Sequence, residues 1–356
     1  MKLRILTLSF ILLAFIAGCS EKFDITQFKT DENNANVGGD TVYIQLNPTW
    51  EGFNNPQDLL IGKEPFLYVA DTDNDRIVMM NLDGKVLGYR SIKKPIAITQ
   101  DYKLNLIVCA EFDTLINGVT KTYSAVYKLN MVAANHNIDA APIKMILPRP
   151  SDLSAPERKY TGVTAFYDNS FYVSRFGPNN TSFIDPDNSI LVFNVIDNKD
   201  SLVGKVSLLE PLGTGLSSAN NITSLTSFSR KNIDIIATYK GNNSFKVQWL
   251  TFISTNEKSA YESKLSPVNA EMMIPNRFSQ PEGTCIDNSG NIFVADAGKD
   301  SIFKFNARGE QLQSIAGDDA LKLKSPYAVG FFDKTIYVAD TKNNRIVRFI
   351  LSTDIR

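Results

Sequence analysis

The chain has 356 residues and is almost neutral, with 37 Lys and Arg against 38 Asp and Glu and a formal net charge of −1. No basic run stands out from this balance, so the charge excludes a nucleic acid as the expected partner. The length beyond residue 40 is enough to bury a large core in one domain.

The first 18 residues have the pattern of a signal peptide. Lys2 and Arg4 form a short basic start, and residues 5–17 form an apolar run of thirteen residues, too short for a membrane span. The run ends in Ile16-Ala17-Gly18-Cys19, which resembles the lipobox of bacterial lipoproteins. The resemblance implies cleavage before Cys19 and attachment of a lipid to this cysteine. An ordinary secretory signal followed by a chance cysteine is the alternative.

Residues 19–40 are polar and rich in Asn, Asp and Glu, so we expect a flexible tether between the lipid and a domain at 41–356. Without residues 1–18 the chain keeps 35 basic and 38 acidic residues, a net charge of −3. Ser20 follows the cysteine, where the enterobacterial inner-membrane retention signal has Asp. We therefore expect a lipid-anchored protein of the bacterial cell envelope, in the outer membrane rather than the inner.

One phrase occurs near both ends of the chain. Residues 67–77 return as residues 336–346, and residues 292–303 are a looser copy. Internal repetition at this scale predicts a repeat architecture. Around the copies, short predicted strands alternate with turn clusters, starting with an alternating β-branched and aromatic run at 41–46. The predicted starts of the repeat units are Pro56, Pro95, Tyr160, Ile222, Pro281 and Pro326.

Six four-stranded units predict a closed ring, because each small sheet has to bury both faces against its neighbours. The last unit supplies three strands, around 327–331, 336–339 and 346–350. We expect residues 41–46 to add the fourth strand, which would close the ring and leave no exposed sheet edge. The predicted fold class is all-β, a six-bladed β-propeller of four-stranded blades.

The repeated phrase Tyr-Val-Ala-Asp-Thr-x-Asn-x-Arg-Ile, with Pro upstream and Asp83-Gly84 downstream, resembles the NHL repeat. The first, fifth and sixth units match it well, and the middle three match only in the rhythm of their strands. The resemblance implies a six-bladed β-propeller. NHL propellers include protein-binding and RNA-binding modules and a lyase, and related propellers include lactonases and esterases, so the fold does not specify the function.

The repeated aspartates Asp71, Asp296 and Asp340 could form a ring of carboxylates, but their positions favour a structural role. Each ends a second strand and precedes turn residues, where its side chain can bond the backbone of its own turn. Arg76 and Arg345 follow two of them by five residues, as expected for ion pairs. The other two cysteines, Cys109 and Cys285, lie in apolar strands of different units, so we expect buried free thiols.

Catalytic patterns are weak in this sequence. His136 is the single histidine, and one histidine cannot build the zinc sites of a propeller lyase or phosphotriesterase. No Gly-x-Ser-x-Gly nucleophile elbow is present. A lactonase-like calcium site needs only carboxylates and amides, and Glu111, Asn221 and Asp296 could supply these ligands at the pore.

The starts of first strands and the loops between second and third strands share one face of a propeller, where ligands usually bind. Departures from the repeat at these positions put a cation, two tyrosines, amides and carboxylates around one funnel, which suits a polar organic ligand. The predicted ligand-binding residues are Gln57, Glu111, Arg175, Asn221, Tyr239, Glu282 and Tyr327.

We therefore expect a monomeric, membrane-anchored binding or interaction module. Its partner would be a glycan, a peptide or another envelope protein, and it would need no cofactor. The first alternative is a hydrolase or lactonase with a divalent cation such as calcium at the pore. The second is a structural component of a larger envelope complex.

Overall fold

A computed structural model describes residues 42–355, except 229–230, 258, 266–270 and 318–321. The predicted signal peptide (1–18), the tether (19–40) and Cys19 lie outside the described residues. Within the described part of the chain, no helix is long and apolar enough to cross a membrane.

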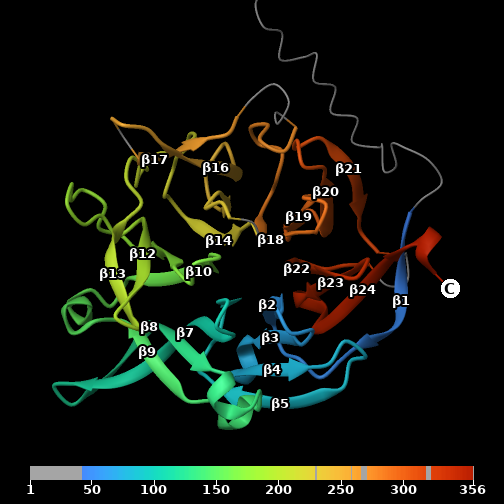
Figure 1. Cartoon of the computed structure of the whole chain (residues 1–356), viewed down its shortest axis with the longest axis horizontal. Helices are drawn as coiled ribbons and strands as arrows, with labels where there is room; N and C mark the ends of the chain where they lie inside the picture. The colour runs from blue at the N-terminus through green and yellow to red at the C-terminus, as the bar shows by residue number, and fades with distance from the viewer. Residues whose placement is uncertain (1–41, 229–230, 258, 266–270, 318–321, 356) are drawn as a thin grey trace, which may run out of the picture. The chain divides into compact units, whose positions relative to one another are not determined.

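Six antiparallel sheets of four strands each form a ring (Figure 1), which confirms the predicted all-β propeller. Blades one to three consist of β2 (Pro56–Ile61), β3 (Leu67–Asp71), β4 (Arg76–Met80) and β5 (Val86–Ser91); β6 (Ala97–Gln100), β7 (Asn105–Ile116), β8 (Val119–Asn130) and β9 (Ile143–Leu147); and β10 (Lys159–Ala165), β11 (Phe171–Phe176), β12 (Ser189–Ile196) and β13 (Lys199–Lys205).

The second half of the ring has the same order of strands. Blades four to six consist of β14 (Ile222–Ser227), β15 (Ile235–Tyr239), β16 (Val247–Ser254) and β17 (Ser259–Ser263); β18 (Pro281–Ile286), β19 (Ile292–Asp296), β20 (Ser301–Phe305) and β21 (Gln311–Ile315); and β22 (Pro326–Phe332), β23 (Thr335–Asp340), β24 (Arg345–Leu351) and β1 (Tyr43–Trp50). The helical segments among the described residues are short 3₁₀ turns, namely η2 (Thr72–Asn74), η3 (Val132–Ala134), η4 (Ile138–Ala140), η5 (Pro150–Ser154), η6 (Thr341–Asn343) and η7 (Ser352–Asp354).

Strand β1 closes the ring as predicted. It pairs antiparallel with β24, with Tyr43 opposite Leu351 and Leu46 opposite Arg348, and it forms the outer edge of blade six (Figure 1). Four predicted unit starts coincide with the first residue of a first strand. Tyr160 lies one residue inside β10, and Pro95 lies two residues before β6.

The repeated phrase exists because the second strand of each blade is buried on both faces. All five residues of β3 and of β19 are buried, and so are the last five of β23. Six apolar clusters fill the molecule, one at each of the six interfaces between neighbouring blades. A strand packed on both sides has to be apolar throughout, so its sequence varies little from blade to blade.

The repeated aspartates have a structural role, as predicted, but Asp71 and Asp340 bond backbone amides of the preceding loop instead of those of their own turn. Asp71 is fully buried, and its carboxylate accepts hydrogen bonds from the Asn54 amide and from the Arg76 guanidinium, both at 2.7 Å. Asp340 is bound in the same way by the Lys324 amide at 2.6 Å and by Arg345 at 2.7 Å. These bonds fix the turn between the second and third strands to the loop that arrives from the previous blade.

Candidate functional site

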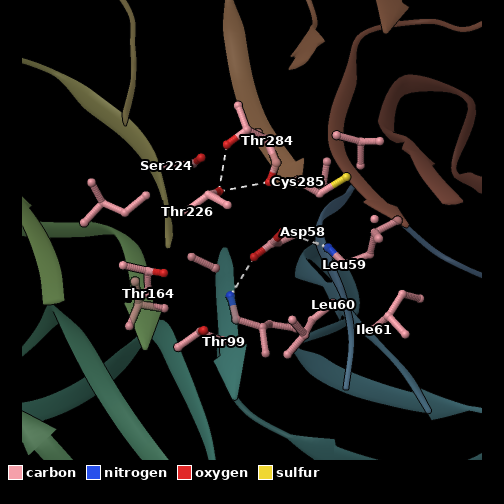
Figure 2. A pocket seen from close by; sticks show the side chains of 18 of the residues that line it. Asp58, Leu59, Leu60, Ile61, Thr99, Thr164, Ser224, Thr226, Thr284 and Cys285 are labelled. Atoms are coloured by element: carbon pink, nitrogen blue, oxygen red, sulfur yellow. Dashed lines mark hydrogen bonds between the residues drawn. The ribbon is translucent and has the colours of Figure 1, made fainter. Parts of the chain in front are cut away.

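The six first strands surround a central channel that contains a cavity of about 390 Å³. Figure 2 shows this cavity from close by, with side chains from several blades pointing toward its centre. Much of its wall consists of small hydroxyl side chains, which include Thr99, Thr164, Ser224, Thr226 and Thr284. The ionisable residues among its lining are Asp58, Lys63, Glu282 and Cys285.

Five of the six first strands have the same shift in pairing near their first residue, at one end of the channel. In blade one Pro56 pairs with Asp71 and Asp58 pairs with Ala70, so Gln57 is an extra residue with no partner across the strand pair. Such a bulge re-aims a side chain. The residues skipped in the same way are Gln57, Thr161, Thr223, Glu282 and Tyr327. We call these five residues the bulge ring.

Glu282 and Tyr327 of the bulge ring lie next to each other on blades five and six. Burial raises the pKa of the Glu282 carboxyl, although a 2.5 Å hydrogen bond from the Gln280 amide and the charge of Lys240 oppose the rise. Burial also raises the pKa of Tyr327, and the nearby Glu282 adds to it. The two strands approach this closely because Gly283 has no side chain: a Cβ there would lie 2.5 Å from the Tyr327 carbonyl oxygen.

Asp58 extends into the channel one residue beyond the bulge ring (Figure 2). Its carboxylate accepts a hydrogen bond from its neighbour Leu59 at 2.8 Å and one from the Ile98 amide of blade two at 2.6 Å. Burial raises the pKa of this carboxyl to about 7, and the two amide hydrogen bonds only partly oppose it. The group therefore changes charge near neutral pH.

Sequence reasoning missed Asp58, although a signal for it exists. The residues that follow the bulge in the other four bulged strands are Gly162, Ser224, Gly283 and Ala328. Small side chains suit a position where neighbouring first strands come close together, and an aspartate is the exception. Once the bulge is known, a comparison of equivalent positions in the blades, which identified Gln57, also identifies Asp58.

The opposite end of the channel carries a different set of polar groups. The Lys63 ammonium lies 3.9 Å from the centre of the Tyr102 ring. Glu64 accepts hydrogen bonds from the Gln100 amide, and the Nδ1 atom of His136 lies 3.3 Å from the Glu64 carboxylate. The single histidine is thus part of a surface network at the end of the channel away from the bulge ring.

The seven predicted site residues divide into two groups. Gln57 and Glu282 line the cavity, and Tyr327 lies beside Glu282. Glu111 is 3.4 Å from the Lys159 ammonium, an ion pair between blades two and three. Asn221 precedes β14 with a positive φ of 57°, and its side-chain amide donates to Asn220. Four of these five residues belong to loops or strand ends on the side of the bulge ring, and Glu111 lies in the middle of β7.

Arg175 and Tyr239 are instead held inside their blades. Arg175 is 2 % exposed, and its guanidinium donates to the Asp187 and Pro186 carbonyls and to the Asp185 carboxylate. Tyr239 is 0 % exposed and donates to the Ser218 carbonyl at 2.9 Å. Both occupy the register position that Asp71 has in blade one. Arg175 fixes the turn of its own blade, and Tyr239 holds the loop that arrives from blade three, so neither side chain is free to bind a ligand.

Two of the three residues considered for calcium have other partners. Asp296 is fully buried, and its two carboxylate oxygens accept hydrogen bonds from the amides of Ser279, Gln280 and Gly298. Glu111 is paired with Lys159. Among the residues that the structure describes, no group of three or more His, Cys, Asp or Glu is placed to hold a metal ion.

Both remaining cysteines are free thiols, as expected. Cys109 is fully buried, and burial raises the pKa of its thiol. Cys285 differs from the expectation, because it is only partly buried and lines the channel. The sequence could not distinguish the two, since both lie in apolar strands.

Comparison with known families matches residues 278–305, from just before β18 to the end of β20, to the NHL repeat. No curated protein sequence matches the chain. The NHL repeat in blade five and the six-bladed propeller therefore agree with the resemblance seen in the repeated phrase.

Several solved structures share the fold. A Bacteroides thetaiotaomicron protein of unknown function has a TM-score of 0.55 and 15% identity, over 88% of this chain and 76% of that one. A gluconolactonase from Xanthomonas campestris has a TM-score of 0.55 and 13% identity, over 90% and 92%. An auxiliary nutrient binding protein from Bacteroides thetaiotaomicron has a TM-score of 0.56 and 9% identity, over 84% and 70%. At these identities the likeness shows the fold alone.

Proposed function

We propose that this propeller is a binding module that holds a polar ligand, a glycan or a peptide, at the end of the channel where the bulge ring lies. The observation that supports the proposal is the bulge shared by the strands of Gln57, Glu282 and Tyr327. Gln57 and Glu282 line the cavity, and Tyr327 lies beside Glu282. A concave site with a few convergent polar groups is the usual form of a small-ligand site.

The chemistry of these three side chains suits a polar ligand. The Gln57 amide can donate and accept, the Glu282 carboxyl can accept, and the Tyr327 ring adds an apolar face beside its hydroxyl. The cavity beneath them, about 390 Å³, lies within the range of small-molecule pockets. The hydroxyl groups along its wall add further donors and acceptors.

Binding is favoured over the lactonase alternative by the state of the carboxylates. Propellers with this fold include both gluconolactonases and a nutrient binding protein, so the fold is compatible with either function. In this chain the Asp296 carboxylate is already saturated by three backbone amides, and Glu111 is paired with Lys159. A hard divalent cation needs several oxygen ligands that are free to coordinate it.

We further propose that the module is attached to the bacterial cell envelope, at the outer membrane, through a lipid on Cys19. The support is the basic start, the short apolar run and the lipobox-like segment before Cys19. Such an anchor would place the binding site near the membrane surface and let it collect a ligand or meet an envelope protein there.

The binding proposal is tested with the full chain, extracted in mild detergent and applied to glycan and peptide arrays. Hits are then titrated against the wild type and against Gln57→Ala and Tyr327→Ala. We expect each variant to lose at least tenfold in affinity, and Glu310→Gln, on the outer edge of blade five, to match the wild type. Absence of hits on both arrays, or hits that neither variant weakens, would refute the proposal.

A further inference from the structure

We infer that the ligand carries an ammonium or guanidinium group, which enters the channel at the bulge ring and lies between Glu282 and Asp58. This inference rests on the proposed binding function and narrows the class of ligand. It selects basic peptides and amino sugars over neutral glycans and acidic peptides.

At the end of the cavity that bears the bulge ring, acidic side chains are in excess among the lining residues. Both carboxyl groups of its lining, Glu282 and Asp58, lie within the first three residues of their strands. The one cation among the described lining residues is Lys63, which lies beyond the other end of β2 and is stacked on Tyr102. A cation entering at the bulge ring therefore meets two acidic groups first.

Asp58 lacks a cationic partner among the described residues. Its hydrogen bonds come from the backbone amides of Leu59 and Ile98, and no lysine, arginine or histidine forms an ion pair with it. A carboxylate removed from water is costly unless a cation compensates it. Burial raises the pKa of Asp58, and a ligand cation beside this carboxyl would favour its charged form.

The neighbours of Glu282 also favour the binding of a cation by its carboxylate. The Gln280 amide holds one of its carboxylate oxygens, which leaves the other available to a ligand. Tyr327 lies beside it, and an aromatic ring next to a carboxylate is a favourable setting for an organic cation. Lys240 is near enough to stabilise the charge of Glu282 partly, but it does not line the cavity.

The hydroxyl groups of the wall complete the site chemically. An ammonium group has three N–H donors and needs acceptors, and hydroxyl oxygens can accept as well as donate. Thr226 and Thr284 already share a 2.7 Å hydrogen bond, which fixes the direction of their hydroxyls across the channel from Asp58 (Figure 2). A neutral sugar could also bond these hydroxyls, but it would leave Asp58 without a countercharge and Glu282 with only the nearby Lys240.

The test compares matched ligands that differ only in charge, by isothermal titration calorimetry on the full chain in detergent. The probes are tetraglucosamine against its fully N-acetylated form, and tri-lysine against its side-chain-acetylated form. We expect at least one cationic probe to bind at least tenfold more tightly than its neutral partner. Glu282→Gln and Asp58→Asn should each reduce this preference at least fivefold.

Two controls separate a specific site from general attraction. Glu310→Gln removes the same charge from an exposed position on blade five and should leave the preference unchanged. Asp58→Asn could disturb folding because Asp58 joins two blades, so its unfolding temperature is measured, and Glu282→Gln tests the same point independently. An equal effect of Glu310→Gln would mean non-specific attraction and would overturn the inference.

The remaining outcomes distinguish this inference from the proposed function. Tight binding of the neutral probes that is lost in Gln57→Ala would overturn the cationic ligand and keep the binding function. Binding of none of the probes, together with empty glycan and peptide arrays, would overturn both.

Discussion

The Asp58 carboxylate of blade one accepts a 2.6 Å hydrogen bond from the Ile98 amide of blade two. This bond crosses from one first strand to the next inside the channel, so one side chain both joins two blades and places a negative charge in the cavity. Its structural and functional roles can be separated, because they depend differently on charge.

The stability of the protein should depend on pH through Asp58. Burial raises the pKa of this carboxyl from 3.8 to about 7, so between these values the folded state binds more protons than the unfolded state. Stability is therefore highest below pH 4 on this account and falls as the pH rises to 7, by at most about 4 kcal/mol and less if water enters the channel.

Asp58→Asn should flatten this part of the profile. The measurement is chemical unfolding of wild type and variant at several pH values between 4 and 8. Glu282 contributes a fall of the same sign, since burial raises its pKa too, so the difference between the two proteins is the informative quantity. Parallel profiles would mean that Asp58 titrates as an ordinary aspartate.

Gly283→Ala should destabilise the contact between blades five and six. The added Cβ would lie 2.5 Å from the Tyr327 carbonyl oxygen and 3.1 Å from the Ala328 Cα, so the two first strands would have to separate. We expect a loss of about 1–3 kcal/mol in unfolding free energy. Gly215→Ala is the control, because a Cβ there meets no atom within 4 Å. Equal stability of both variants would show that the first strands of blades five and six can separate at little cost in free energy.

Thr341→Val should weaken the closure of the ring. The Thr341 hydroxyl donates a buried 2.7 Å hydrogen bond to the Pro56 carbonyl, which links blade six to blade one. Its loss leaves a buried carbonyl without this donor, at a cost of about 1–2 kcal/mol. Thermal unfolding of Thr341→Val and Thr341→Ser tests this, since serine keeps the hydroxyl. Similar losses in the two variants would attribute the effect to packing.

Arg175→Met should loosen the turn of blade three. The buried guanidinium holds Asp185, Pro186 and Asp187 together, and removing it leaves the two carbonyls without this donor, whereas the Asp185 carboxylate keeps its bond from Arg158. We expect a destabilisation of about 1–3 kcal/mol, from the two buried carbonyls, and faster proteolysis within residues 177–188. Ligand affinity should stay near the wild-type value when both proteins are fully folded. A large loss of affinity without a loss of stability would indicate that Arg175 contacts the ligand.

Cys19→Ser should release the protein from the membrane fraction, since the proposed anchor depends on this one side chain. Metabolic labelling with a fatty acid should mark the wild type and leave the variant unlabelled. Continued membrane association of an unlabelled variant would show that another feature anchors the chain.

The repeat could be read from the sequence because burial on both faces constrains each second strand. Leu67 to Asp71 and Ile292 to Asp296 are similar because the four apolar side chains of each strand pack against neighbouring blades and the aspartate holds a turn. The ring closure was predictable for a related reason: the last blade needed a fourth strand, and an alternating run remained at the other end of the chain.

The candidate site was only partly predictable. Gln57, Glu282 and Tyr327 were found by their place at the start of a first strand, but Arg175 and Tyr239 were placed at the funnel by the same rule and are buried. A large side chain in the position of a repeated aspartate can face a ligand or hold its own turn. Its neighbours in space decide which, and they come from loops that the repeat does not describe.

By itself, the sequence determined the class of fold, the number of blades and the strand that closes the ring, because these follow from local patterns of burial repeated along the chain. Only the tertiary structure decided which side chains face the channel. Each first strand contributes one short wall segment, and the bulge that turns Gln57 or Glu282 toward the cavity is a shift in pairing between strands. Such a shift cannot be recognised within either strand alone, so the exceptional aspartate at position 58 could be identified only after the pairing of the strands was known.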